Sequence, residues 1–247
     1  MNFQNKVIII TGASKGIGKS IALSLHLKGA NVFLISRDRN LKKVFKNFSN
    51  NKNNSYFIGD VTDERFVKKT FNIIYKKNNK IDALINNAGI SGLEKINKIT
   101  LKKWDYVINN NLKSSFVCSK IISKYYIKQN YGNIVNISSV AGRNYSIVAG
   151  VHYTASKAGV IGLTKQLAYE LSKYNVRVNC IAPSQTKTET LLKSLKQKKI
   201  NIKTLSNKLP LGRLAEPNDI ANACLFLVSD QSSYINGSVI DVNGGII

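Results

Sequence analysis

The sequence predicts an α/β fold built on a doubly wound parallel sheet of about seven strands with helices on both faces. Short apolar runs of strand length alternate with longer segments whose apolar residues recur at helical spacing. This alternation is typical of repeated βαβ units, in which a helix connects each strand to the next. The 247 residues contain neither an internal repeat nor a linker, so we expect one domain over residues 1–247.

The expected strands are runs rich in valine and isoleucine, bounded by turn residues. In chain order they read KVIIIT, NVFLIS, SYFIG, IDALIN, NIVNIS, VRVNCIA and GSVIDV. Helical spacing covers residues 17–27, 66–75, 112–127 and 153–171 between them. Two segments depart from this rhythm. KNFSNNKNNS, after the second strand, predicts a loop on a frayed helix end, and a basic stretch from Lys187 to Lys208 follows Pro183.

The composition is typical of a globular protein. Hydrophobic residues make up 43% of the chain, and no apolar run approaches the roughly 18 residues of a membrane span. A strand-like run begins almost at the first residue, so we expect no signal peptide, a cytoplasmic location and no membrane partner. Cys118, Cys180 and Cys224 lie in apolar surroundings without a CxxC pair, which predicts reduced core residues. The sequence holds no cluster of metal-ligand residues, so we expect no metal site.

The charge balance is strongly basic, with 37 Lys and Arg against 13 Asp and Glu and a formal net charge of +24. Two explanations stay open: polyanionic partners such as nucleic acid, anionic membrane or an acidic carrier protein, or a general enrichment in lysine and asparagine. The lysines are scattered, and aromatic residues are not interleaved with them. We therefore expect no specific nucleic-acid partner.

The segment TGASKGIGKS, residues 11–20, follows the first strand and opens a helix. Gly12 allows a tight turn, Gly16 lets the backbone approach a phosphate, and Gly18 lets the helix pack near the strand. The helix N-terminus then presents unpaired N–H groups and a positive dipole to a pyrophosphate. The sequence therefore predicts a dinucleotide site, whose further contacts in this loop are Ser14, Lys15 and Ile17.

The tip of the second strand, in FLISRDRN, indicates which dinucleotide binds. An acidic residue there would accept the ribose hydroxyls of NAD(H), whereas a 2′-phosphate requires a cation. Ser36 holds the tip, Arg37 follows it, and Lys15 supplies a second cation. The site therefore favours NADP(H). NAD(H) stays open because Asp38 could fold back onto a hydroxyl, and so does the alternative that both cations are ordinary solvated side chains.

Tyr153 and Lys157 stand four positions apart, which places them on one face of a helix. Around them the chain resembles the short-chain dehydrogenase/reductase family over essentially its whole length. The motifs that carry the resemblance are TGASKGIG at 11–18, NNAG at 86–89, NNL at 110–112, NISS at 136–139, YTASK at 153–157 and NG at 236–237. The resemblance implies a Rossmann-type fold and hydride transfer between a nicotinamide and a carbonyl or secondary alcohol.

The resemblance implies a catalytic set of Asn111, Ser139, Tyr153 and Lys157. Tyr153 would exchange a proton with the substrate oxygen, and Lys157 would contact the cofactor ribose and lower the pKa of the phenol. Ser139 would hydrogen-bond to the substrate oxygen, with Ser138 as the alternative, and Asn111 would hold a water that links Lys157 to solvent. The spacing from Ser139 to Tyr153 is slightly longer than the family pattern, which puts the intervening loop in doubt.

Further cofactor contacts are implied at the other strand ends. They are Asn87, Ala88 and Gly89 next to Asn86, then Asp60 and Val61 beside the adenine, and Ile181, Pro183 and Thr186 at the nicotinamide carboxamide. Two positions depart from the family pattern. Ser184 stands where a glycine is expected, and Asn243 stands where an aspartate is frequent.

The helix that carries Tyr153 is rich in small residues, namely Ala155, Ala158, Gly159 and Gly162. The resemblance implies that these residues pack against the helix around residues 112–127 of a second subunit, in a homotetramer or homodimer. His152 stands beside Tyr153, and a lone histidine at such a place is more often structural or substrate-lining than catalytic.

Within the family, the sequence looks most similar to enzymes of fatty acid biosynthesis that reduce 3-oxoacyl thioesters bound to an acyl carrier protein. NIVNISSVAG, YTASKAGVIGLTKQLAYEL and PLGRLAEPNDIANACLFLVSD carry that likeness. Dehydrogenases of sugars, polyols and hydroxyacids share nearly the same framework and stay open as alternatives. Outside the enzymes, a non-catalytic nucleotide-binding regulator is the competing class, and the intact catalytic set argues against it.

Overall fold

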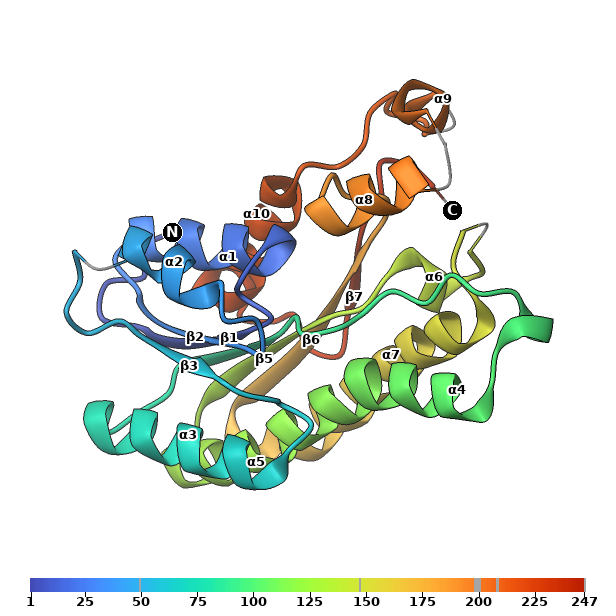
Figure 1. The fold of residues 1–247 in the computed structure, drawn as a ribbon. Coiled ribbons are helices and arrows are strands. Elements are labelled where there is room, and N and C mark those ends of the chain that lie inside the picture. Colours follow the sequence, from blue (N-terminus) through green and yellow to red (C-terminus); the bar gives the residue numbers. More distant parts are fainter. Residues whose placement is uncertain (49, 147, 198–200, 208, 247) are drawn as a thin grey trace.

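The computed structural model has a seven-stranded parallel sheet between two layers of helices (Figure 1). It describes all residues except 49, 147, 198–200, 208 and 247. The strand order is β3-β2-β1-β4-β5-β6-β7, and all neighbouring strands are parallel. The strands are β1 (Val7–Thr11), β2 (Asn31–Ser36), β3 (Ser55–Ile58), β4 (Ala83–Asn86), β5 (Gly132–Ile137), β6 (Val176–Pro183) and β7 (Val239–Val242). The predicted fold class is confirmed.

Helices cover both faces of the sheet, as Figure 1 shows. One face carries α1 (Gly16–Leu27), α2 (Leu41–Phe45) and α10 (Pro217–Val228). The other carries α3 (Glu64–Asn78), α5 (Ser114–Gln129) and α7 (Val151–Leu171), with α4 (Leu101–Ile108) against α7. Three short helices lie beyond the carboxyl ends of the strands: α6 (Val140–Arg143), α8 (Glu189–Gln197) and α9 (Ile202–Ser206).

The core has two halves, because successive side chains of a strand point to opposite faces of the sheet. In β1, Ile8 and Ile10 pack toward α1 and α10, whereas Val7 and Ile9 pack toward α3 and α5. Every residue of β1 is buried, which is why residues 7–10 form a continuous apolar run before Thr11. Cys118, Cys180 and Cys224 are free and buried, in agreement with the predicted core positions.

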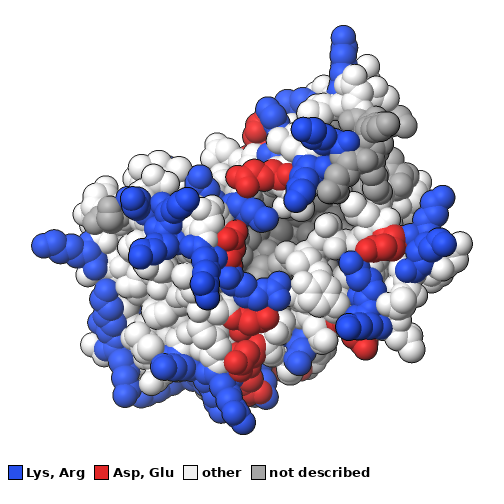
Figure 2. Space-filling model, in the orientation of Figure 1, with Lys and Arg blue, Asp and Glu red and all other residues white. Residues whose placement is uncertain are grey.

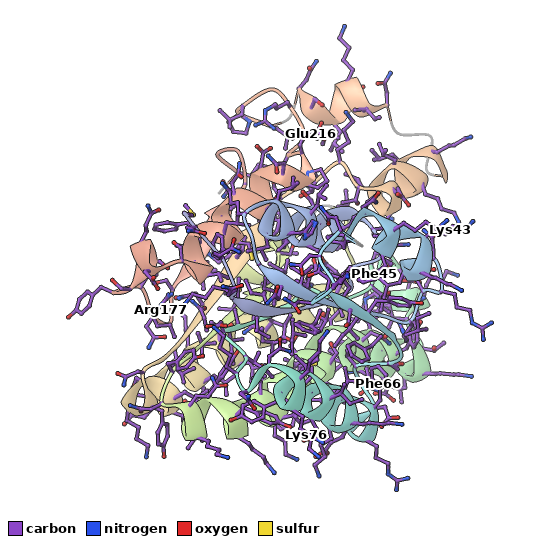
Figure 3. The ribbon with its side chains drawn as sticks, turned by 90° about the vertical axis from the view of Figure 1, so that its left-hand side faces the viewer. Lys43, Phe45, Phe66, Lys76, Arg177 and Glu216 are labelled. Carbon is purple, nitrogen blue, oxygen red and sulfur yellow. The ribbon has the colours of Figure 1, made fainter. Side chains whose placement is uncertain are left out.

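The helices α2 and α3, which flank the β3 edge of the sheet, each have an apolar and a charged face. Figure 3 shows Phe45 of α2 and Phe66 of α3 directed toward the sheet from its two sides, while Lys43 and Lys76 of the same helices extend into solvent. Phe45 packs on Tyr56 of β3 with 4.8 Å between ring centroids. This arrangement closes both halves of the core at the β3 edge.

The predicted helix over residues 112–127 begins differently in the structure. A π-helical turn spans Asn109–Lys113 and joins α4 to α5, which starts at Ser114. Asn110 donates from Nδ2 to Tyr106 O at 2.7 Å, and the Asn111 side chain bonds to Ile90 instead of facing solvent. The Asn110 amide thus competes for a carbonyl of the preceding turn, at the point where the π-helical turn begins.

Lysine and arginine side chains are spread over the whole visible face of the molecule in Figure 2 and form no single patch there. The basic stretch from Lys187 to Lys208 forms α8 and α9, with residues 198–200 and 208 outside the described part. In the part of the chain that the structure describes, none of the helices combines the length and the hydropathy needed to cross a membrane.

Gly132 in β5 packs directly under the ring of Tyr126, which is fully buried. A Cβ at Gly132 would lie 2.3 Å from Tyr126 Cγ. We therefore expect Gly132→Ala to lower the free energy of unfolding by about 1–3 kcal/mol through overpacking. Urea unfolding measures this cost. In a Tyr126→Leu background, where space is available, the same change should cost much less, and equal costs in the two backgrounds would contradict the packing argument.

Candidate active site

A cavity of about 680 Å³ opens at the carboxyl ends of the strands. It lies where β1 has β2 on one side and β4 on the other, so the loops that leave the two strand ends diverge. Such a reversal of strand order is the usual ligand site of an open parallel sheet. Most residues predicted to bind the cofactor line the cavity: Gly12, Ser14, Lys15, Gly16, Ile17, Ser36, Arg37, Asp60, Val61, Asn87, Ala88, Gly89, Tyr153, Lys157, Pro183 and Thr186.

The glycine loop adopts the conformation that its sequence predicts. Gly12 has φ +66° and Gly16 has φ +53°, in the left-handed region that favours glycine. No side chain caps the N-terminus of α1 at Lys15. The loop and the helix therefore offer backbone N–H groups and a positive dipole to an anionic group, which fits a pyrophosphate.

Gly18 is buried behind the loop and does not line the cavity, although we expected a cofactor contact. A Cβ at this position would lie 2.4 Å from both Asn87 Nδ2 and Gly12 O. Asn87 Nδ2 donates to Thr11 O at 3.0 Å and to Gly12 O at 3.1 Å. Gly18 thus permits the contact that holds the glycine loop against the end of β4.

Arg37, at the tip of β2, pairs with Asp60 at 3.1 Å between Nη1 and Oδ2. Desolvation opposes the charged carboxylate, but hydrogen bonds from Thr62 and the Arg37 guanidinium together lower the pKa of Asp60. The Arg37 side chain is 45% exposed, so it remains accessible from the cavity. Asp38 Oδ1 accepts a hydrogen bond from Asn40 N at 2.9 Å, within its own turn.

The segment after β6 crosses the opposite side of the cavity. Ser184, at the position where a glycine was expected, lies among the lining residues with Thr186. Thr186 is buried, and its Oγ1 donates to Ser184 O at 3.0 Å. Ile181 is buried inside β6 and is not part of the lining.

Tyr153 and Lys157 both face the cavity from α7, beside Ser139 at the end of β5. The Ser139 side chain hydrogen-bonds to the Tyr153 hydroxyl. The neighbouring Ser138 is buried, and its Oγ donates to Lys157 O at 2.8 Å. Of the two serines, Ser139 is therefore the one whose hydroxyl meets the tyrosine.

The expected lowering of the Tyr153 pKa does not occur in this structure. Burial raises the pKa of Tyr153, and the hydrogen bond with Ser139 offsets only part of that effect. Lys157 Nζ donates to Ile137 O at 2.8 Å and lies 5.8 Å from the Tyr153 ring centroid. Burial also lowers the pKa of Lys157 to about 8. The ammonium group is thus directed to a backbone carbonyl instead of the phenol oxygen.

Asn111 lies behind the cavity wall and is 1% exposed. Its Oδ1 accepts from Ile90 N at 2.7 Å, and its Nδ2 donates to Ser156 Oγ at 2.9 Å. A Cβ at Gly89 would lie 3.0 Å from Asn111 Oδ1 and 3.6 Å from Lys157 Nζ. Asn111 therefore joins the segment after β4 to α7 near the lysine.

Several lining residues were missed in the sequence. Thr188 packs on the glycine loop, because a Cβ at Gly16 would lie 3.1 Å from Thr188 Cγ2. The buried Gln185 Oε1 has no hydrogen-bond partner among the described residues. Apolar side chains from the basic stretch also line the cavity, namely Leu191, Leu195 and Leu205. The leucine spacing in α8 was the available signal, but the lysines around it obscured the pattern.

Comparison with known proteins agrees with this geometry. A family model described as Enoyl-(Acyl carrier protein) reductase matches residues 12–247. The chain is 39% identical over 251 residues to the 3-oxoacyl-[acyl-carrier-protein] reductase of Thermotoga maritima, and the alignment covers 100% of both chains.

Solved structures match over nearly the whole chain. ElxO with NADP bound is 34% identical, with a TM-score of 0.91 and 98% of each chain covered. A short-chain type dehydrogenase/reductase from Mycobacterium ulcerans is 26% identical, with a TM-score of 0.92 and coverage of 99% of this chain and 90% of that chain. The chain belongs to the short-chain dehydrogenase/reductase family of NAD(P)-dependent oxidoreductases, as these full-length matches show and as the glycine loop and the cavity lead one to expect.

Proposed function

We propose that the protein is an NADPH-dependent reductase of 3-oxoacyl thioesters bound to an acyl carrier protein. The observation that carries this proposal is that the cavity lined by Tyr153 is also lined by Leu191, Leu195 and Leu205. Side chains of this kind suit an alkyl chain and offer no hydrogen bonds to sugar hydroxyls. The Thermotoga maritima relative, which is named as a reductase of such thioesters, supports the same choice.

In this proposal Tyr153 is the proton donor. Its raised pKa keeps the phenol protonated at neutral pH, so it can give a proton to the substrate oxygen. NADPH, when bound, supplies the hydride. As the carbonyl carbon receives it, negative charge develops on the oxygen, which Ser139 holds through its hydroxyl and Tyr153 neutralises with its proton.

Lys157 and Asn111 support the tyrosine. With a pKa of about 8, Lys157 is mostly charged at neutral pH, and a nearby ammonium favours the phenolate that remains after proton transfer. Lys157 would also contact the cofactor ribose. Asn111 fixes the segment beside the lysine. In this proposal it also holds the water that links Lys157 to solvent, through which Tyr153 regains a proton.

The nucleotide end fits NADP(H) better than NAD(H). Arg37 and Lys15 are exposed at the rim of the cavity, where a 2′-phosphate would find two cations. Asp38 also lines the cavity, and among the described residues only its Oδ1 accepts a backbone N–H, from Asn40, so its carboxylate is the group that would bind a ribose hydroxyl in the alternative NAD(H) enzyme. ElxO, which resembles this chain, has a structure with NADP bound.

We also propose that residues 1–247 act as one domain and assemble as a homotetramer or homodimer. Ala155, Ala158 and Gly162 of α7 are exposed in the single chain, and nothing lies within 4 Å of a Cβ built at Gly162. Phe116 of α5 is 47% exposed and Tyr169 of α7 is 80% exposed. The same two helices of a second copy are the surface that we expect to cover them.

Tyr153→Phe should keep the fold and NADPH binding but reduce turnover about 10²- to 10⁴-fold, the usual effect of removing a positioned acid. Steady-state kinetics measures turnover, and fluorescence titration measures NADPH binding. Tyr174→Phe, which removes a hydroxyl from the turn after α7, is the matched control and should leave turnover unchanged. Near-normal turnover of Tyr153→Phe would remove the tyrosine from the mechanism.

The substrate proposal is tested with a panel of 3-oxoacyl thioesters, sugars, polyols and hydroxyacids, each followed by nicotinamide absorbance. A 3-oxoacyl thioester should be reduced faster than any sugar, because the leucine side chains of the cavity contact an alkyl chain. Turnover of a sugar or polyol alone would select the alternative dehydrogenase function. Absence of turnover for every compound, with NADPH still bound, would favour a nucleotide-binding regulator.

NADPH should exceed NADH in kcat/KM, because each charge-assisted contact to the 2′-phosphate contributes about 1.5–3 kcal/mol, or roughly 10- to 150-fold in affinity. The double change Ser36→Asp with Arg37→Ala should reverse the order, since a carboxylate accepts the ribose hydroxyls and repels phosphate. Arg39→Ala removes an exposed cation outside the cavity and serves as the control. A native preference for NADH would exclude Arg37 as a phosphate ligand.

A further inference from the structure

His152 lies in the first turn of α7, directly before Tyr153, and its side chain is completely buried. Its Nε2 lies 3.1 Å from Glu94 Oε2, in the segment that connects β4 to α4. A carboxylate only accepts hydrogen bonds, so Nε2 carries the hydrogen and donates it. The bond joins residues 58 positions apart in the chain.

Glu94 is itself held in place by two other groups. Its Oε1 pairs with Lys103 Nζ of α4 at 2.9 Å, and its Oε2 also accepts from Leu93 N at 3.0 Å. The hydrogen bond from Lys103 is the main reason why the pKa of Glu94 is about 2. The carboxylate is therefore charged at neutral pH, which strengthens its bond with His152.

Two glycines make room for the His152 ring. A Cβ at Gly92 would lie 2.6 Å from His152 Cε1, and a Cβ at Gly150 would lie 2.9 Å from the same atom. Gly150 N also donates to Gly92 O at 2.8 Å. The ring is thus enclosed between the start of α7 and the segment after β4, whose Ser91, Gly92 and Leu93 line the cavity.

Packing alone does not account for a histidine at this position. His152 Nδ1 is buried and has no hydrogen-bond partner among the described residues. An apolar side chain of similar size would avoid that unfavourable burial. The Nε2 bond to Glu94 is what an apolar side chain could not supply.

We propose that His152 and Glu94 are positioning residues that fix the cavity wall at residues 91–93 relative to Tyr153, and so set how the carbonyl substrate lies against the tyrosine. From the proposed reductase function, this proposal takes only that the substrate is a carbonyl compound. It applies to any carbonyl compound that the protein reduces. Neither side chain lines the cavity, so both act through the segment that they hold.

The test compares His152→Leu with His152→Gln in the full chain, using whichever carbonyl compound the unsubstituted protein reduces. His152→Leu should raise the KM of that compound about tenfold or more, because small misplacements in a site have large effects, while the Kd of NADPH changes less than about twofold. His152→Gln keeps a donor near the Nε2 position and should restore most of the loss. An unchanged KM in His152→Leu would overturn the proposal.

Glu94→Leu leaves the histidine in place but removes the acceptor of its Nε2 hydrogen, so it tests the same bond from its other end. This variant should raise the KM of the same carbonyl compound. The double variant with His152→Leu should have a KM no higher than that of the more affected single variant, since both changes remove the same interaction. Independent, multiplying effects would overturn the pairing. His26→Leu is the matched control: this second buried histidine bonds to Asn54 Nδ2 at 3.2 Å and should affect stability without moving KM.

A measurement without turnover separates this proposal from the proposed function. Hydrogen exchange of the peptide that covers residues 90–95 should be faster in His152→Leu than in the unsubstituted protein, and His152→Gln should restore protection. If the substrate panel gives no turnover but exchange changes in this way, the reductase function fails and the His152–Glu94 link stands. Unchanged exchange would overturn the link whatever the activity.

Discussion

The site depends on the pairing of β1 with both β2 and β4. Because the connections from the two strand ends leave in different directions, a cavity opens at their carboxyl ends. At the inner end of this cavity, the Asn87 side chain donates hydrogen bonds to the backbone carbonyls of Thr11 and Gly12. Gly18 permits this close approach, since any Cβ there would meet both Asn87 and Gly12. The position of the nucleotide loop therefore depends on a contact that leaves no room for a side chain.

Features encoded by local pattern could be predicted from the sequence. The apolar run of β1 and the glycines at 12 and 16 each specify a conformation that neighbouring residues determine. The four-residue spacing of Tyr153 and Lys157 likewise placed both on the cavity side of α7. The start of α5 was harder to predict, because a π-helical turn with side-chain bonds of Asn110 and Asn111 precedes it, and the local sequence pattern does not mark that turn.

Contacts between residues distant in the chain could not be predicted, because nothing in the local pattern marks them. Arg37 meets Asp60, and Thr188 meets the glycine loop, only once the sheet has formed. The sequence likewise does not reveal that burial raises the pKa of Tyr153 in this structure, or where the Lys157 ammonium bonds. The acceptor of that ammonium is a buried backbone carbonyl, Ile137 O.

The raised pKa of Tyr153 and the lowered pKa of Lys157 have one cause, since burial disfavours the charged form of each group. In the proposed reduction, the resting phenol is already protonated and the lysine mostly charged. Once the phenol gives up its proton, a phenolate and an ammonium lie in the same partly buried site, where their attraction exceeds that in bulk water. The burial that opposes the phenolate at rest therefore strengthens the interaction that stabilises it after transfer, which suits the tyrosine to act first as an acid.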